Sequence, residues 1–216
     1  MYDLKLLKAV EKLPVFSLAD AAKITKSRSY AKKLLSRLTN QSIIKRIRRD
    51  AYTIHDDPMV VAPFLYPSYV SCASALQYHG LISQIPNAVF LMTPKRSKTI
   101  HYNIPLVYHT TKNYFGFEIV NYNGIKLPMA SPEKAFIDSI GIHPIHVVLE
   151  ALDELDPEKI LFYAKRTGET RRAGYLLEKK YKTKPPKCMS NRYIYLDPLS
   201  ARTGKKEKTW KLILNC

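Results

Sequence analysis

The sequence predicts a protein of the α+β class: helices and a hairpin come first, and a mixed second half follows. Apolar residues recur at helical spacing through residues 2–40, short β-branched runs flank a charged tip within residues 43–54, and Asn123-Gly124 joins two strand-like runs. We expect the second half to hold a small, mainly antiparallel sheet and a helical, basic C-terminal part. Packing helices against such a sheet is typical of α+β architecture.

The first helices have clear start signals. Ser17 and Asp20 have the spacing of a capping box, and Ser27 is a natural N-cap for the next helix. The apolar stripe of that helix comprises Ala31, Leu34, Leu35 and Leu38. A preceding helix over residues 2–13 completes a three-helix core, with Leu4, Leu7 and Val10 pointing inward.

A basic hairpin is expected directly after these helices. Ile43 to Ile47 and Ala51 to Ile54 are the two strand runs, and Arg48-Arg49-Asp50 is the tip between them. Helix, turn, helix and basic hairpin is the plan of a winged helix-turn-helix domain. In that plan the second helix lies in the DNA major groove, and the hairpin contacts a phosphate or the minor groove.

This plan predicts the residues that contact double-stranded DNA, the operator of a regulator. Contacts to bases are expected from Ser27, Arg28, Ser29, Tyr30 and Lys33. Contacts to phosphates are expected from Lys26, Lys32, Arg37, Lys45, Arg46, Arg48 and Arg49. The alternative is a solvated basic helix face without a ligand, which the concentration of cations on these two surfaces disfavours.

Positive charge gathers at both ends of the chain. The formal net charge of +17 divides into +8 for residues 1–56, −2 for residues 57–156 and +11 for residues 157–216. Basic ends indicate polyanionic partners, although a lysine-rich surface kept for solubility or heat resistance is an alternative for the C-terminal part. A second surface, for an acidic protein partner or for nucleic acid, is predicted at Lys165, Arg166, Arg171, Arg172, Lys179 and Lys180.

Composition and turn-forming residues limit the possible domain organisation. A hydrophobic content of 46% suffices for a packed core. His55-Asp56-Asp57-Pro58 predicts a boundary between a DNA-binding domain over residues 1–56 and an α+β domain over residues 57–216. The amphipathic start is unlike a signal peptide, and no apolar run has the length of a membrane span. Three widely spaced cysteines, at positions 72, 188 and 216, favour a reducing cytoplasm.

The second half carries further local signals. Residues 71–80 predict a helix, residues 88–93 and 100–109 predict strands, and Ser131-Pro132 opens another helix. Later helices are expected over residues 144–155, 156–166 and 173–181, followed by strands at 193–196 and 209–214 around a basic turn at 202–206.

Two segments of the middle resemble a known family. Residues 69–82, YVSCASALQYHGLI, and residues 115–140, FGFEIVNYNGIKLPMASPEKAFIDSI, resemble segments of AbiEi-type antitoxins and regulators from type IV toxin–antitoxin systems. The resemblance covers about residues 1–140, and its ASPEKA…D piece is fairly specific. It implies a winged-helix domain that represses the operon and a C-terminal domain that counters a nucleotidyltransferase toxin.

The sequence does not favour an enzyme. His143 and His146 have a spacing that two metal ligands could use, but helix-end histidines are more often surface residues, and no acid completes a site. Glu118 and Lys126 are expected to face each other across the Asn-Gly hairpin, as an ordinary cross-strand pair. Ser131 is read as an N-cap. We therefore expect no catalytic residue, cofactor or metal.

Two further alternatives stay open. A nucleic-acid-processing protein with a nuclease-like middle sheet and no toxin partner is the alternative to a regulator. Tyr193 and Tyr195, near Arg192, could stack on unpaired bases, although packing within a strand is the commoner role of alternating aromatic residues.

Overall fold

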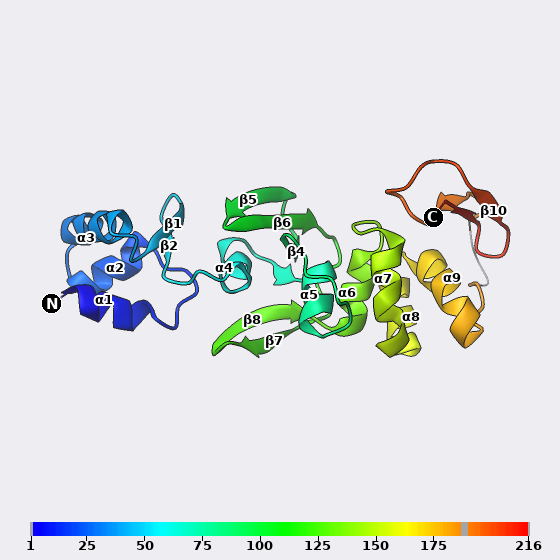
Figure 1. The fold of residues 1–216 in the computed structure, drawn as a ribbon, viewed down its shortest axis with the longest axis horizontal. Helices are drawn as coiled ribbons and strands as arrows, with labels where there is room; N and C mark the ends of the chain where they lie inside the picture. The colour runs from blue at the N-terminus through cyan, green and yellow to red at the C-terminus, as the bar shows by residue number, and fades with distance from the viewer. Residues whose placement is uncertain (1, 187–189, 216) are drawn as a thin grey trace.

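The computed structural model describes residues 2–186 and 190–215, so Cys188 and Cys216 lie outside the described residues. The chain runs from a helical unit at one end, through a central sheet with helices, to a small sheet at the other end (Figure 1). The mixed α+β composition predicted from the sequence is confirmed.

Three helices and a hairpin form the N-terminal unit. Its elements are α1 (Tyr2–Val10), α2 (Leu18–Thr25), α3 (Arg28–Asn40), β1 (Lys45–Arg48) and β2 (Ala51–Thr53), the two strands pairing antiparallel. Both halves of the capping box between Ser17 and Asp20 are present, and Ser27 accepts a hydrogen bond from the backbone N–H of Tyr30 at 3.3 Å. The start signals of α2 and α3 are therefore confirmed.

The N-terminal unit has its own core. Its buried side chains are Leu6, Val10, Phe16, Ala21, Ala31, Leu34, Leu35, Leu38 and Ile44. The α3 stripe is confirmed, but the expected inward position of Leu4 is wrong, because Leu4 is 62% exposed. Leu6 and Val10, four residues apart, set the buried face of α1, and Leu4 lies about half a turn away from Leu6.

The central sheet is mixed and larger than the sequence indicates. Its strands are β3 (Tyr69–Val70), β4 (Val89–Thr93), β5 (Lys98–Tyr102), β6 (Ile104–Thr110), β7 (Phe117–Tyr122) and β8 (Ile125–Ala130), in the order β5-β6-β4-β3-β8-β7. The pairs β5/β6, β3/β4 and β7/β8 are antiparallel, whereas β4/β6 and β3/β8 are parallel. Antiparallel pairs predominate, as expected, but the two parallel pairs make the sheet mixed, since they join strands that are not hairpin neighbours.

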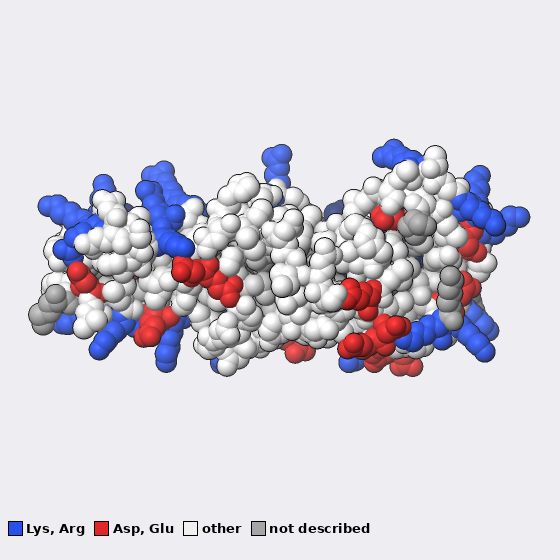
Figure 2. All heavy atoms as spheres, viewed as in Figure 1, with Lys and Arg blue, Asp and Glu red and all other residues white. Residues whose placement is uncertain are grey.

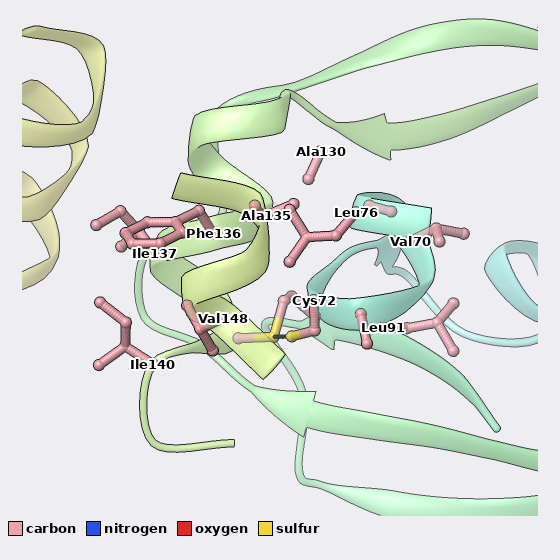
Figure 3. Close-up of a cluster of buried hydrophobic side chains, with 14 of the residues drawn as sticks. Val70, Cys72, Leu76, Leu91, Ala130, Ala135, Phe136, Ile137, Ile140 and Val148 are labelled. Carbon is pink, nitrogen blue, oxygen red and sulfur yellow. Dashed lines mark hydrogen bonds between the residues drawn. The ribbon is translucent and has the colours of Figure 1, made fainter. Parts of the chain in front are cut away.

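Three helices pack with this sheet. They are α4 (Pro58–Leu65), α5 (Cys72–Tyr78) and α6 (Pro132–Ser139). Figure 3 shows Leu76 of α5 near Ala135 of α6, with the strand residues Val70 and Leu91 beside α5, and all four side chains are fully buried. Every residue of α6 after Pro132 is buried, including Glu133, Lys134 and Asp138.

The C-terminal part is helical first and then β. Its elements are α7 (Ile145–Ala151), the 3-10 turn Leu152–Glu154, α8 (Pro157–Thr167), α9 (Thr170–Tyr181), β9 (Ile194–Tyr195), β10 (Lys205–Glu207) and β11 (Leu212–Leu214). The last three strands form a sheet in the order β10-β11-β9. The expected turn at residues 202–206 is therefore wrong in part, because Lys205 and Lys206 belong to β10, which pairs with β11.

Polar contacts join the N-terminal unit to the central sheet. Lys45 Nζ lies 2.6 Å from a carboxylate oxygen of Asp56, and the backbone carbonyl of Asp56 accepts a hydrogen bond from Asn103 at 2.7 Å. Tyr122 donates to Asp57 at 2.9 Å. The main apolar cluster of the second half also includes Ala51 of β2, with Val15 and Ile47 packed against it, and the division into domains at residue 56 stays a prediction.

Candidate nucleic-acid interface

Helix α3 presents a polar ridge to solvent. With its apolar stripe buried, the rest of its surface is exposed at Arg28, Ser29, Tyr30, Lys32, Lys33, Ser36, Arg37 and Asn40. Four of these eight residues are cationic, and the α3 segment contains no acidic residue. A helix of this kind has the 10–12 Å diameter that the major groove of DNA accommodates.

A groove of about 660 Å³ separates α3 from the hairpin. Its walls are Arg28, Lys32, Ser36, Thr39 and Asn40 of α3, Arg46, Arg49, Asp50 and Tyr52 of the hairpin, and Leu18 of α2. The four cations Arg28, Lys32, Arg46 and Arg49 belong to no ion pair among the described residues. They thus have no intramolecular anion to displace before binding a phosphate.

The one carboxylate in this groove is held by the fold. Asp50 has a left-handed backbone, with φ of 58°, at the hairpin tip, and its side chain accepts the N–H of Leu18 at 2.8 Å. This bond fixes the hairpin tip to the first turn of α2, where the helix dipole favours a negative charge. Asp50 therefore positions the hairpin beside α3.

A second groove, of about 720 Å³, lies on the other side of the α3 ridge. It is lined by Ser29, Lys32, Lys33, Ser36, Arg37, Asn40 and Gln41. Lys32, Ser36 and Asn40 line both grooves, at four-residue spacing along α3. Figure 2 shows Lys and Arg side chains gathered over α3 and the hairpin, and again at the C-terminal end of the molecule.

Three predicted phosphate contacts lie elsewhere or have partners. Arg37 forms an ion pair with Asp3, its Nη2 lying 2.6 and 2.7 Å from the two carboxylate oxygens. Lys45 pairs with Asp56. Arg48 follows an irregularity in the β1–β2 register and lines neither groove.

Arg48 is exposed. Burial raises the pKa of Tyr108, and the positive charge of Arg48 acts in the opposite direction.

The remaining predicted residues surround the start of α3. Ser27 is occupied as the N-cap, and Lys26 is the left-handed C-cap of α2, with an exposed side chain. Tyr30 is 42% exposed and meets the ring of Tyr2 edge-on, with 5.4 Å between ring centroids. The structure brings Arg28, Ser29, Lys32, Lys33, Arg46 and Arg49 together around the ridge.

Sequence reasoning missed part of the lining. Ser36, Thr39, Asn40 and Tyr52 border the grooves without having been predicted as contacts. The signal for Ser36 and Asn40 was present, because they continue the four-residue spacing of Arg28 and Lys32. Tyr52 had no such signal, since its position depends on how the hairpin folds against α3.

The predicted second surface on α8 and α9 is largely engaged within the protein. Arg172 pairs with Glu169 at 2.7 Å and donates to the carbonyl of Tyr195 at 2.9 Å, and Lys180 pairs with Asp153. The Arg166 guanidinium lies 4.2 Å from the centre of the Phe115 ring. Arg171 donates to the carbonyl of Arg192 at 2.7 Å, Lys165 is exposed, and the side chain of Lys179 lies outside the described part.

The central domain holds a buried polar cluster. The Lys134 ammonium contacts the Asp138 carboxylate and lies 2.9 Å from the Tyr69 hydroxyl. Asp138 also accepts hydrogen bonds from Tyr69 at 3.0 Å and Ser71 at 2.8 Å. Burial raises the pKa of Asp138, against the lowering effect of Lys134 and of these hydrogen bonds. The cluster fastens α6 to β3 and to the start of α5, and its groups are paired with one another.

Other candidates for chemistry are not assembled into a site. Glu118 is opposite Met129 and Lys126 is opposite Asn121, so the expected pairing of Glu118 with Lys126 is wrong by register. Ser131 is confirmed as the N-cap of α6, accepting the N–H of Lys134 at 3.3 Å. Among the described residues, no group of three or more His, Cys, Asp and Glu side chains could hold a metal ion.

The two histidines near α7 have different environments. His146 is exposed, whereas His143 is only 9% exposed, which corrects the reading of both as surface residues. His143 Nε2 accepts the N–H of Ala73 at 3.4 Å, and its ring meets Phe90 edge-on. Burial lowers the pKa of His143 to about 4, with a further contribution from His109. His143 is therefore a neutral packing residue at pH 7.

None of the helices in the described ranges combines the length and apolar character needed to cross a bilayer. Comparison of the sequence with protein-family models and with curated proteins gives no match. The surface built by α3 and the β1–β2 hairpin is thus interpreted from its own geometry and charge.

Proposed function

We propose that the protein is a cytoplasmic transcriptional regulator that binds operator DNA through an N-terminal winged helix-turn-helix domain. In this proposal α3 enters the major groove, and Arg28, Ser29 and Lys33 near its start approach the base edges. Lys32, Arg46 and Arg49 contact phosphates on either side of the inserted helix. The resemblance to AbiEi-type regulators implies that this binding represses the operon.

The observation that carries the proposal is the groove between α3 and the hairpin. Four unpaired cations line it, and its single carboxylate, Asp50, is bound to a backbone N–H. Solubility alone does not require a projecting helix with a hairpin fixed beside it. Binding to a nucleic-acid duplex uses both elements, because the helix enters the groove and the hairpin reaches the phosphates that flank it.

The resemblance to AbiEi-type antitoxins extends the proposal to the rest of the chain. We propose that the part after residue 56 counters a nucleotidyltransferase toxin, while the N-terminal part represses the shared operon. Co-expression with a nucleotidyltransferase encoded beside this gene tests this role. Growth should be restored by the wild-type chain and equally by the Arg46→Gln/Arg49→Gln variant, and continued growth arrest with both contradicts the antitoxin role.

The DNA-binding role is tested by titrating the full chain with DNA from upstream of its own gene and with a scrambled duplex, over a salt series. We expect a preference of about a hundredfold for the upstream DNA. Arg46→Gln/Arg49→Gln should weaken binding to both duplexes and reduce the salt slope by about 2, because two phosphate contacts are lost. Arg28→Gln/Lys33→Gln should reduce the preference itself.

The matched control is Lys95→Gln/Lys126→Gln, which removes the same charge from exposed positions on the central sheet domain. It should leave the preference and the affinity nearly unchanged. Equal binding to both duplexes by the wild-type chain contradicts a specific regulator. Unchanged binding by Arg46→Gln/Arg49→Gln removes the hairpin from the proposed interface.

A further inference from the structure

The small sheet β9–β11 carries a second group of cations that form no ion pair among the described residues. Residues 190–215 contain six cations and two acids, the cations being Arg192, Arg202, Lys205, Lys206, Lys208 and Lys211. None of the six takes part in an ion pair within the described residues. All but the half-buried Lys211 are exposed.

Both acids of this segment accept hydrogen bonds from backbone N–H groups. Asp197 is 2% exposed and accepts hydrogen bonds from the backbone N–H of Ile145 and Leu199. Glu207 accepts the N–H of Thr209 at 2.8 Å and of Trp210 at 2.6 Å. Burial raises the pKa of Glu207, but these hydrogen bonds and the positive charge of Lys211 outweigh it, so the pKa is lowered. The carboxylates therefore stabilise turns, and the cations stay available to a ligand.

Two of these cations lie close to one tyrosine ring. The ammonium groups of Lys206 and Lys211 lie 5.5 and 5.6 Å from the centre of the Tyr193 ring. Cation–π attraction at such distances holds two like charges together without an anion between them. Arg192 precedes this tyrosine, and its carbonyl accepts a hydrogen bond from Arg171 on α9.

The sheet is held firmly to the helices beneath it. The Trp210 side chain is fully buried, and a Cβ atom on Gly174 of α9 would lie 2.3 Å from the Trp210 ring, so only glycine permits this contact. Gly204 is equally required, because a Cβ there would lie 2.2 Å from the carbonyl oxygen of Leu214. The cations thus project from a close-packed support, which reduces the entropy lost when a ligand binds.

We propose that this basic cluster, defined as Lys206 and Lys211 at the Tyr193 ring together with the preceding residue Arg192, is a second nucleic-acid contact that binds the phosphate backbone. It lies at the end of the molecule opposite α3 (Figure 1). The excess of cations, six against two acids whose carboxylates accept backbone N–H groups, matches a polyanion with evenly spaced charges better than a protein surface of mixed charge. This contact is independent of the operator interface proposed above.

The test measures binding of the full chain to two fluorescent probes of about 30 nucleotides, a duplex DNA of arbitrary sequence and a single-stranded RNA, across a salt series. The variant Arg192→Gln/Lys206→Gln/Lys211→Gln should bind about tenfold more weakly at about 0.1 M salt, with a salt slope lower by about 2 to 3. A loss confined to the duplex or to the RNA supports the proposal and identifies the strand state that this contact prefers.

Two controls separate charge from folding. Lys95→Gln/Lys112→Gln/Lys126→Gln removes the same charge from other exposed positions and should stay within about twofold of wild type. Lys206→Arg/Lys211→Arg keeps the charge and should retain binding. All variants should unfold within a few degrees of the wild-type temperature, as surface substitutions do.

The same triple substitution is repeated in a chain that also carries Arg28→Gln, Arg46→Gln and Arg49→Gln. A further loss of about tenfold is expected there, because the two contacts act separately. If the operator interface is wrong, the N-terminal substitutions alone have no effect, while the C-terminal triple still weakens binding. The proposal is overturned if the C-terminal triple binds both probes as well as its charge-matched control does, and an acidic protein then becomes the partner to seek.

Discussion

The basic surface on α3 and the hairpin differs from the basic surface on α8 and α9 in what its cations touch. Arg28, Lys32, Arg46 and Arg49 line a groove and form no ion pair among the described residues. On α8 and α9, Arg172 and Lys180 are paired with acids, and Arg171 is bonded to a backbone carbonyl. Net charge alone does not distinguish these two surfaces.

The difference shows when a cluster of cations indicates a ligand. A cation that already has a carboxylate or carbonyl partner must lose that partner before it can bind a phosphate, and much of the gain is cancelled. Unpaired cations on a rigid support bind a phosphate without first losing such a partner. By this criterion the C-terminal charge belongs to two groups, a paired set on the helices and an unpaired set on β9–β11.

Lys134 is the most deeply buried cation with an intramolecular partner, and substitution of that partner, Asp138, tests how much the pair stabilises the fold. Asp138→Ala leaves the Lys134 ammonium buried without a counter-charge, and we expect the free energy of unfolding to fall by about 3–5 kcal/mol. Urea unfolding measures this loss. The matched control is Asp153→Ala, which removes the exposed partner of Lys180 and should cost less than about 1 kcal/mol. Equal losses for the two variants would show that the burial of the pair has no energetic consequence.

A second prediction concerns His143, a group whose positive charge the fold excludes. Its pKa is lowered to about 4 in the folded chain, so between about pH 6.5 and pH 4 the unfolded chain binds more protons than the folded one. Stability contributed by the neutral ring is therefore present above pH 6.5 and is lost as pH falls. The full shift corresponds to about 3 kcal/mol, and we expect about 2 kcal/mol because the ring borders a groove beside Pro144 and Val147.

The measurement is the unfolding free energy of wild type and His143→Gln at several pH values within this window. The variant keeps a hydrogen-bond acceptor for the Ala73 N–H but has no titrating ring, so its stability should fall less as the pH is lowered. The variant His146→Gln, at an exposed position, should follow wild type. The same pH dependence in His143→Gln and wild type contradicts the assignment to His143.

Local signals in the sequence predicted much of the fold. Ser17, Ser27 and Ser131 begin helices as expected, and Asn123-Gly124 turns the hairpin between β7 and β8. Caps and two-residue turns act over three or four residues, so they can be read from the sequence. The order of strands in the central sheet could not be predicted this way. The parallel pairing of β3 with β8, at Val70 and Met129, joins residues far apart in the chain.

The same distinction between local and distant contacts applies to the candidate site. Helical spacing correctly groups Arg28, Lys32 and Lys33 on the solvent face of α3. Helical spacing does not predict that Asp3 pairs with Arg37 or that Asp56 pairs with Lys45, because these acids come from other parts of the chain. Nor does alternation along a strand predict the register irregularity between Arg46 and Arg48, or that Arg48 lines neither groove.

The smallest predicted effect compares one cation from each surface directly. Arg172→Gln removes a partly buried ion pair and a hydrogen bond, so the free energy of unfolding should fall by about 1 kcal/mol, while DNA affinity stays within about twofold. Lys32→Gln should do the reverse. Its stability should change by less than about 0.5 kcal/mol, and its affinity for upstream DNA should fall several-fold, because an unpaired phosphate contact is lost. Measuring the unfolding free energy and the DNA affinity of both variants tests whether paired and unpaired cations differ in function. If Arg172→Gln loses as much DNA affinity as Lys32→Gln, intramolecular pairing does not decide which cations bind nucleic acid.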